Sequence, residues 1–136
     1  MAYVTLFIPV IVLFQLMFTL GFSYILSVGF VYLLGDWGKE KIYKIGVTRG
    51  KIEKRIKSLQ TGNSGEIYIV DYFETENPFF IEKRLHLIYN KERISKEKEW
   101  FELELEDVKK FKKHCEDIEK LIKTMKENHF CPKSIK

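Results

Sequence analysis

Residues 29–47, GFVYLLGDWGKEKIYKIGV, decide the fold that we predict for this chain. Residue types typical of strands fill both ends of the stretch, and Gly35-Asp36-Trp37-Gly38 between them has the composition of a turn. The second end, residues 41–47, is expected to be a strand. The first end, residues 29–34, has two interpretations, a first strand or the last turn of a preceding helix. If it is a strand, the stretch forms a β-hairpin.

Downstream of this stretch, apolar spacing predicts three helices and two strands. The expected segments are a helix over 51–60, a strand over 67–73, a helix from 78 to about 89, a short strand over 99–103 and a helix over 106–127. In the second helix, Ile81, Leu85 and Ile88 are expected to face the core. The order β-β-α-β-α-β-α indicates a small α+β domain, in which helices flank one mixed sheet of three or four strands.

Upstream of the stretch, the chain is apolar and uncharged. Residues 1–35 contain no Asp, Glu, Lys or Arg, and residues 2–26 are long enough to cross a bilayer. We therefore expect a single-pass transmembrane anchor, and the basic flank after it would place the C-terminal domain in the cytoplasm. A buried core helix and a mistaken upstream extension of the reading frame are the alternatives. A cleaved signal peptide is disfavoured because the first residues carry no basic group.

This contrast divides the chain into three expected parts. They are a hydrophobic segment over 1–28, a domain over 29–104, and a C-terminal amphipathic helix and tail over 105–136. All charged residues and the net charge of +4 belong to the last two parts. Such a composition excludes a disordered acidic protein and a collagen-like fibre, and the length excludes a large multidomain enzyme.

The expected elements carry the residue types that phosphodiester hydrolysis requires. Such a reaction needs a group that activates water, a carboxylate for a metal ion, and cations for the transition state. Tyr32 and Lys44 lie on the two predicted strands of the opening stretch, and Arg55 and Glu82 lie on the first two predicted helices.

Six short strings of this chain resemble motifs of the GIY-YIG endonuclease superfamily. Three of them resemble the superfamily as a whole: Val31-Tyr32, Tyr43-Lys44-Ile45-Gly46 and Glu53-Lys54-Arg55-Ile56-Lys57. Three more resemble a branch found mostly in phages and large DNA viruses: Leu59-Gln60-Thr61-Gly62-Asn63, Ile81-Glu82-Lys83-Arg84-Leu85-His86 and Glu99-Trp100-Phe101. The resemblance extends from about Gly29 to Phe111, and the strings occur in the order of the family pattern.

The resemblance implies a role for each matching residue. Tyr32 would deprotonate or position the attacking water, Arg55 would contact the scissile phosphate, and Glu82 would hold a divalent metal. A single carboxylate suits Mg²⁺ or Mn²⁺, because Mg²⁺ keeps several waters and uses phosphate oxygens as ligands. Nearby cations, Lys44 and Arg55, are expected to lower the pKa of Tyr32. The implied activity is metal-dependent cleavage of DNA.

The chain departs from the family pattern at two places. Lys44 occupies the place of the second tyrosine, and Tyr43 lies one residue earlier, so a strand would point the two to opposite faces. The motif register favours Lys44 as the residue in the site. The late asparagine of the family has no clear match here, and His86 and Glu99 are possible replacements.

Residues 39–57 contain eight Lys or Arg and two Glu, which is typical of a surface that follows a phosphate backbone. No base-reading motif is visible, so DNA binding of low sequence specificity is expected. Two alternatives stay open. One is a GIY-YIG-like module that binds nucleic acid but is catalytically weak or inactive, and the other is a membrane-surface or partner-binding protein.

Overall fold

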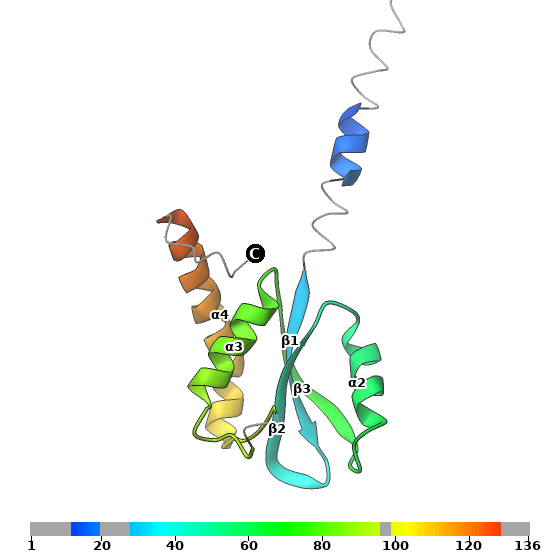
Figure 1. The fold of residues 1–136 in the computed structure, drawn as a ribbon, viewed down its shortest axis with the longest axis vertical. Helices are drawn as coiled ribbons and strands as arrows, with labels where there is room; N and C mark the ends of the chain where they lie inside the picture. The colour runs from blue at the N-terminus through cyan, green and yellow to red at the C-terminus, as the bar shows by residue number, and fades with distance from the viewer. Residues whose placement is uncertain (1–11, 20–27, 96–98, 129–136) are drawn as a thin grey trace, which may run out of the picture.

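The computed structural model describes residues 12–19, 28–95 and 99–128, and within 28–128 these form one four-stranded sheet with three helices (Figure 1). The strands lie in the order β3-β1-β2-β4. The elements are β1 Gly29–Asp36, β2 Lys39–Thr48, α2 Ile52–Gln60, β3 Ile67–Thr75, α3 Pro78–Ile88, β4 Trp100–Glu102 and α4 Leu105–Glu127.

The sheet confirms the predicted α+β class, with helices flanking three to four strands. The strand arrangement differs in one respect, because all three strand pairings are antiparallel where a mixed sheet was expected. The reason is the position of β1. Strands β2 and β3 run in the same direction, joined through α2, but β1 lies between them and pairs with both. No two parallel strands are therefore neighbours.

Helices α3 and α4 cover one face of the sheet, and α2 covers the other (Figure 1). The α3/α4 face holds the larger core, which includes Val31, Leu33 and Ile45 from the sheet and Phe111 from α4. The α2 face holds a smaller core of Tyr32, Leu34 and Ile67, with Ile56 and Leu59 of α2 packed on it. Alternate residues of β1 thus point into different cores.

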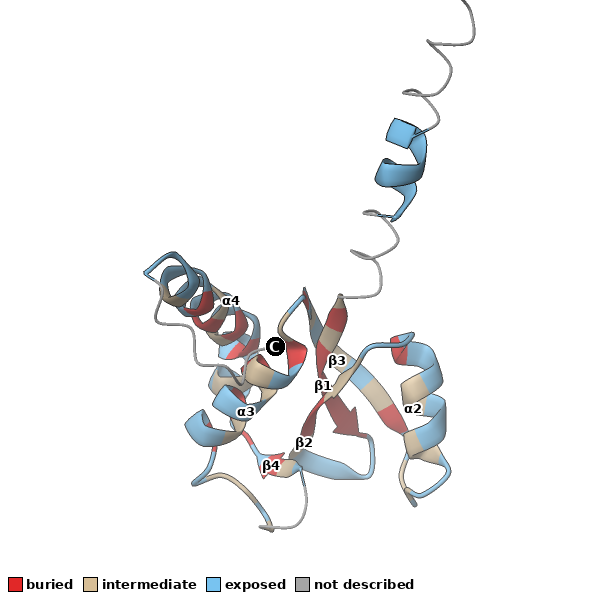
Figure 2. Cartoon of the chain, turned by 45° about the horizontal axis from the view of Figure 1, so that its top comes forward, coloured by how far each residue is buried: buried red, intermediate tan, exposed pale blue. Residues whose placement is uncertain are grey.

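Strand β1 is the centre of the molecule and is buried along almost its whole length (Figure 2). This position decides between the two interpretations of residues 29–34, which form a strand and not the last turn of a helix. A strand that is buried on both faces carries apolar residues at successive positions, as Val31, Leu33 and Leu34 do here.

Helix α3 buries a slightly different stripe from the one predicted. Ile81 and Leu85 are fully buried as expected, but Ile88 is 46% exposed and Tyr89, just after the helix, is buried instead. The hydroxyl of Tyr89 donates to the carbonyl of Asp107 at the start of α4. Buried positions at 81, 85 and 89 keep a spacing of four, which fits the 3.6-residue period as well as the predicted stripe does.

The predicted single-pass membrane anchor, and with it the cytoplasmic orientation of the C-terminal domain, is wrong on this structure. Within residues 12–19, 28–95 and 99–128, no helix has both the length and the apolar character to cross a membrane. Apart from residues 12–19, the expected span lies outside the described part of the chain.

Candidate active site

The register of the β1–β2 hairpin decides which side chains share the α2 face. Tyr32 lies opposite Gly46, and Leu34 lies opposite Lys44, so the Tyr32 and Lys44 side chains are on the same face. Tyr43 points to the other face and packs against the larger core, where burial raises its pKa. Of the two adjacent residues, Lys44 is therefore the neighbour of Tyr32.

Gly46 provides the space in which the Tyr32 ring lies. A Cβ at position 46 would be 2.6 Å from the Tyr32 hydroxyl and 2.7 Å from the ring carbon that carries it. Any other residue would therefore displace the ring. Across from this ring, Nε of Arg55 on α2 donates a hydrogen bond of 3.2 Å to the Tyr32 hydroxyl. The motif glycine, tyrosine and arginine thus form one packed unit.

Lys44 is buried and is paired with Glu99, which immediately precedes β4. Their Nζ and Oε2 atoms are 2.7 Å apart, and the Lys44 side chain is 10% exposed. Burial acts to raise the pKa of Glu99, but the hydrogen bond and charge of Lys44 outweigh it, so that pKa is lowered. The Glu99 carboxylate therefore carries its charge at neutral pH in this arrangement.

Glu82 of α3 belongs to the same electrostatic environment, because the charges of Glu99, Lys44 and Arg55 all act on its pKa. Helix α3 contacts β2, and its His86 bonds the Ile45 carbonyl one residue beyond Lys44. Burial, together with the charge of Glu99, raises the pKa of Glu82 to about 7, although the charges of Lys44 and Arg55 oppose the rise. We call Tyr32, Lys44, Arg55, Glu82 and Glu99 the Tyr32 cluster.

The expectation that nearby cations lower the pKa of Tyr32 is wrong. Burial raises this pKa and outweighs the opposing hydrogen bond and charge of Arg55. Tyr32 is 1% exposed. The free-energy cost of desolvating a phenolate there exceeds the stabilisation that the Arg55 guanidinium provides. The Tyr32 hydroxyl is consequently protonated at neutral pH.

His86 lies one turn after Glu82 and is bound to the backbone of β2. Its Nε2 is 3.2 Å from the carbonyl oxygen of Ile45, so this nitrogen must carry the proton that is donated. Its ring lies against Phe101, and burial lowers its pKa. A neutral His86 therefore fastens α3 to the edge of β2, and this contact sets the position of Glu82.

The carboxylates of the site suit a hard divalent cation with few protein ligands. Among the residues that the structure describes, no group of three or more His, Cys, Asp or Glu side chains is placed to hold a metal ion. Glu82 has a half-buried carboxylate, and none of the described residues donates a hydrogen bond to it or forms an ion pair with it. An anion destabilised in this way favours a cation beside it, which agrees with the chemistry of Mg²⁺.

The string Leu59-Gln60-Thr61-Gly62-Asn63 proves to be a structural clasp, a role that sequence reasoning missed. Asn63 Nδ2 donates to the buried carboxylate of Asp36 at 3.1 Å and to the carbonyl of Gly65 at 2.9 Å. The side chain of Gln60 bonds the backbone on both sides of residue 66. The clasp fixes the end of α2, and Arg55 with it, against the hairpin.

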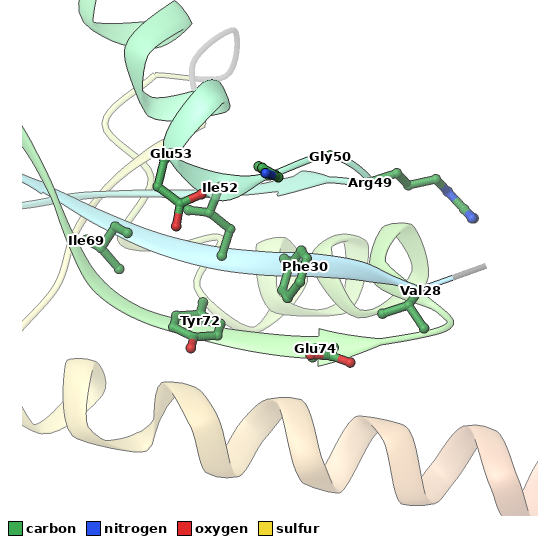
Figure 3. Close-up of a pocket in the computed structure, with 10 residues that line it drawn as sticks. Val28, Phe30, Arg49, Gly50, Ile52, Glu53, Ile69, Tyr72 and Glu74 are labelled. Atoms are coloured by element: carbon green, nitrogen blue, oxygen red, sulfur yellow. The ribbon is translucent and has the colours of Figure 1, made fainter. Parts of the chain in front are cut away.

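Two pockets open on the α2 face beside the Tyr32 cluster. The first, about 800 Å³, is lined by apolar residues of β1, β3 and the start of α2, together with two basic and two acidic residues, Arg49, Lys51, Glu53 and Glu74 (Figure 3). No residue of the Tyr32 cluster lines it. The second, about 640 Å³, has Trp100 and Lys39 in its lining together with Lys44 and Glu99 of the cluster. We call the second the Trp100 pocket.

Comparison with known proteins identifies the family but no individual relative. No curated protein and no solved structure matches the chain. Residues 29–116, well over half of the chain, match the T5orf172 domain, and they include the sheet, all five residues of the Tyr32 cluster and the first half of α4. The chain therefore belongs to the T5orf172 domain family, a family of nuclease-like domains.

Proposed function

We propose that this chain is a GIY-YIG-like endonuclease that hydrolyses DNA phosphodiester bonds with the help of a divalent metal ion. The observation that carries the proposal is the packed unit of Tyr32, Gly46 and Arg55, with Glu82 in the same electrostatic environment. Five chain segments, distant in sequence, contribute to the Tyr32 cluster. A surface with no function would not require a buried tyrosine, a fitted glycine and a half-buried acid at one place.

Arg55 is the residue we assign to the scissile phosphate. A guanidinium has five N–H donors in a planar fork, and the bond from Nε to Tyr32 uses one of them. That bond fixes the plane of the fork, so the other donors are preorganised for phosphate oxygens. Tyr32 accepts from Arg55 and keeps its own proton, so we assign it the positioning of the guanidinium and the attacking water.

Lys44 supplies a second cation where the family pattern has a tyrosine. Its ammonium group is buried and paired with Glu99, and it can also meet the negative charge that develops on the phosphate. Glu99 keeps this ammonium in place. The Lys44 ammonium is therefore held in position before the reaction and needs little rearrangement to stabilise charge on the phosphate.

Glu82, with Glu99 near it, is the side chain that would hold Mg²⁺ or Mn²⁺. Such an ion, when bound, neutralises phosphate charge and makes water a stronger nucleophile. The protein's own part is to keep the Glu82 carboxylate half-buried and in place, which the contact between His86 and Ile45 does.

Basic residues of β2 and α2 form the surface that we assign to the DNA backbone. Lys54 and Lys57 are exposed on α2, the helix that also carries Arg55, and the N-cap residue Lys51 is exposed as well. Contacts of this kind with phosphates are independent of sequence and weaken steeply with salt. We therefore expect DNA binding that is salt-sensitive and of low sequence specificity.

A second candidate function is DNA binding with weak cleavage or none. Two observations favour it: Lys44 stands where the family pattern has a second tyrosine, and the pKa of Tyr32 is raised. A nuclease that relied on a phenolate base would be disabled by both. The two candidates share the same DNA surface and differ in the chemistry at the Tyr32 cluster.

A nicking assay of the full chain on plasmid DNA with Mg²⁺ or Mn²⁺ separates the candidates. We expect nicking by the parent protein and its loss in Glu82→Ala, with calorimetry showing that Mn²⁺ binding is lost as well. Glu116→Ala, which removes an exposed acid from α4, is the matched control and should nick normally. Salt-sensitive binding without nicking would establish the second candidate, and absence of DNA binding would contradict both.

A further inference from the structure

The Trp100 pocket contains two residues, Trp100 and Lys39, that the proposed cleavage chemistry does not use. Trp100 lies directly opposite Lys44 in the β2–β4 ladder, so its ring is on the face of the Tyr32 cluster. The ring is partly exposed, and the ammonium groups of Lys39 and Lys44 lie 5.9 and 5.8 Å from its centre. An accessible indole with two cations is therefore found next to the proposed site of cleavage.

The far wall of the pocket is held rigid by the clasp. Gly62 and Asn63 line it, and the Asn63 side chain is fixed by its bonds to Asp36 and Gly65. A smaller pocket of about 260 Å³ continues from the same residues towards Leu59 and Ile67. The indole thus faces a space that is bounded before any ligand binds, which lowers the cost of ordering a ligand there.

We propose that the Trp100 pocket binds an unpaired nucleotide of the DNA next to the phosphate that is cut. The base would stack on the indole of Trp100, and Lys39 would contact the adjoining phosphate. This inference rests on the proposed function and adds a substrate class to it: DNA with an unpaired nucleotide, as in a bulge, a flap or a junction.

The chemistry favours an unpaired nucleotide over a paired one. In a duplex, each base face is covered by its neighbours, so an indole can stack only on a base that has left the helix. Stacking on an aromatic side chain stabilises a bound base of any kind, because every base has an aromatic face. The Lys39 side chain is 50% exposed, and its ammonium lies 3.3 Å from Oδ2 of Asp36. An ammonium has three donors, so this group can keep its ion pair with Asp36 and also donate to a phosphate.

The test measures how strongly the full chain prefers an unpaired nucleotide. Fluorescence anisotropy, without divalent metal, compares a labelled duplex with the same duplex carrying one unpaired nucleotide. We expect the parent to bind the bulged DNA more tightly, and Trp100→Leu to reduce the ratio of the two affinities about fivefold, or about 1 kcal/mol. Trp100→Phe should keep most of the preference, because a phenyl ring also stacks.

Trp37 provides the matched control. It is 71% exposed and its ring lies 4.5 Å from that of Tyr68, so Trp37→Leu removes an accessible indole that does not line the Trp100 pocket. This variant should keep the preference. In a Trp37→Phe chain, Trp100 is the single tryptophan, and its fluorescence should be quenched by the bulged DNA and hardly by the duplex. This second measurement does not depend on the folding of any Trp100 variant.

Equal affinity of the parent for the two DNAs, an equal effect of the two Leu substitutions, or equal quenching by both DNAs would each overturn the inference. If duplex DNA is still bound and nicked in such a case, the proposed function stands and the pocket assignment alone fails. If the parent binds neither DNA, both fail.

Discussion

Two neighbouring residues of β2, Tyr43 and Lys44, differ completely in their surroundings. Lys44 faces Tyr32 and is paired with Glu99, whereas Tyr43 packs against the larger core on the other face. We predict that Lys44→Ala reduces DNA cleavage more than tenfold, a loss of at least ~1.4 kcal/mol of transition-state stabilisation. Tyr43→Phe should change cleavage little, because only the hydroxyl is removed. Initial rates of plasmid nicking measure both.

Thermal unfolding of the two variants distinguishes lost chemistry from lost fold. Lys44→Ala leaves the Glu99 carboxylate without its partner, but that side chain is 47% exposed and can turn to water. A damaging Tyr43→Phe together with a mild Lys44→Ala would assign Tyr43 to the site and contradict our interpretation.

Glu82 makes the stability of the protein depend on pH. Its pKa of about 7 in the folded chain lies above the ordinary value of 4.5, so between these values the folded state keeps a proton that the unfolded state releases. Stability therefore falls as the pH rises through this window. We predict that Glu82→Gln is more stable than the parent by about 1 kcal/mol at about pH 8, and equally stable below about pH 4.5. The figure allows for screening of a partly exposed group.

Urea unfolding without divalent metal, at about pH 4.5 and about pH 8, measures this difference. Saturating Mn²⁺ at the higher pH should stabilise the parent and not the variant, since binding to the folded state alone raises stability. If the Gln variant has the same stability as the parent at both pH values, the charged form of Glu82 is not destabilised in the folded chain.

At the scale of elements, the clasp in the loop between α2 and β3 bonds this loop to the end of β1 through one amide. We predict that Asn63→Ala destabilises the protein by about 1–3 kcal/mol, because the buried Asp36 carboxylate loses one donor and Gly65 another. The pKa of Asp36, held low first by its bond from Asn63, should rise, so the loss should be largest at neutral pH and shrink on acidification, when the carboxyl is protonated in both proteins. Urea titrations at neutral and acidic pH measure both effects.

Ser64→Ala is the control within the same loop, since residue 64 is exposed. It should unfold like the parent. If both substitutions destabilise the chain equally, the loop is sensitive to any change and the clasp has no special part in stability.

The sequence predicted the elements well because most of them depend on local patterns. Strand β3 and helix α4 have a clear period in their apolar residues, and each lies within a few residues of its expected bounds. Ile88 shows the limit of this method. Helical spacing allows either Ile88 or Tyr89 to be the buried residue that follows Leu85. The hydrogen bond from Tyr89 to Asp107, a contact with a distant segment, favours burial of Tyr89.

The site was less predictable, because its contacts join distant segments. The resemblance supplied Tyr32, Arg55 and Glu82, but no spacing rule could show that Glu99 would lie 2.7 Å from Lys44. The raised pKa of Tyr32 was missed because charges are visible in a sequence and burial is not. Asn63 was noticed only as part of a motif. Its bond to Asp36, 27 residues away, could have been suspected only from the chemistry of a buried acid.

At the scale of the whole molecule, the helix over residues 12–19 belongs to neither core of the domain. All eight of its residues are exposed, including Phe14 and Phe18. We predict that a chain beginning at Gly29 is soluble and melts in the same cooperative transition as the full chain. Circular dichroism at increasing temperature tests this. An insoluble product, or a melt without cooperativity, would show that the segment completes the fold.

The distance in sequence between Lys44 and Glu99 also has a consequence for the newly made protein. The two residues are 55 positions apart, so at ordinary rates of translation Lys44 waits roughly 3 to 11 seconds for its partner to be added. A buried ammonium without an acid is strongly unfavourable, so the hairpin cannot adopt its final packing during that interval. A nascent chain that stops before Glu99 lacks the assembled Tyr32 cluster. Whatever the cluster does to DNA therefore begins only when nearly the whole domain has left the ribosome.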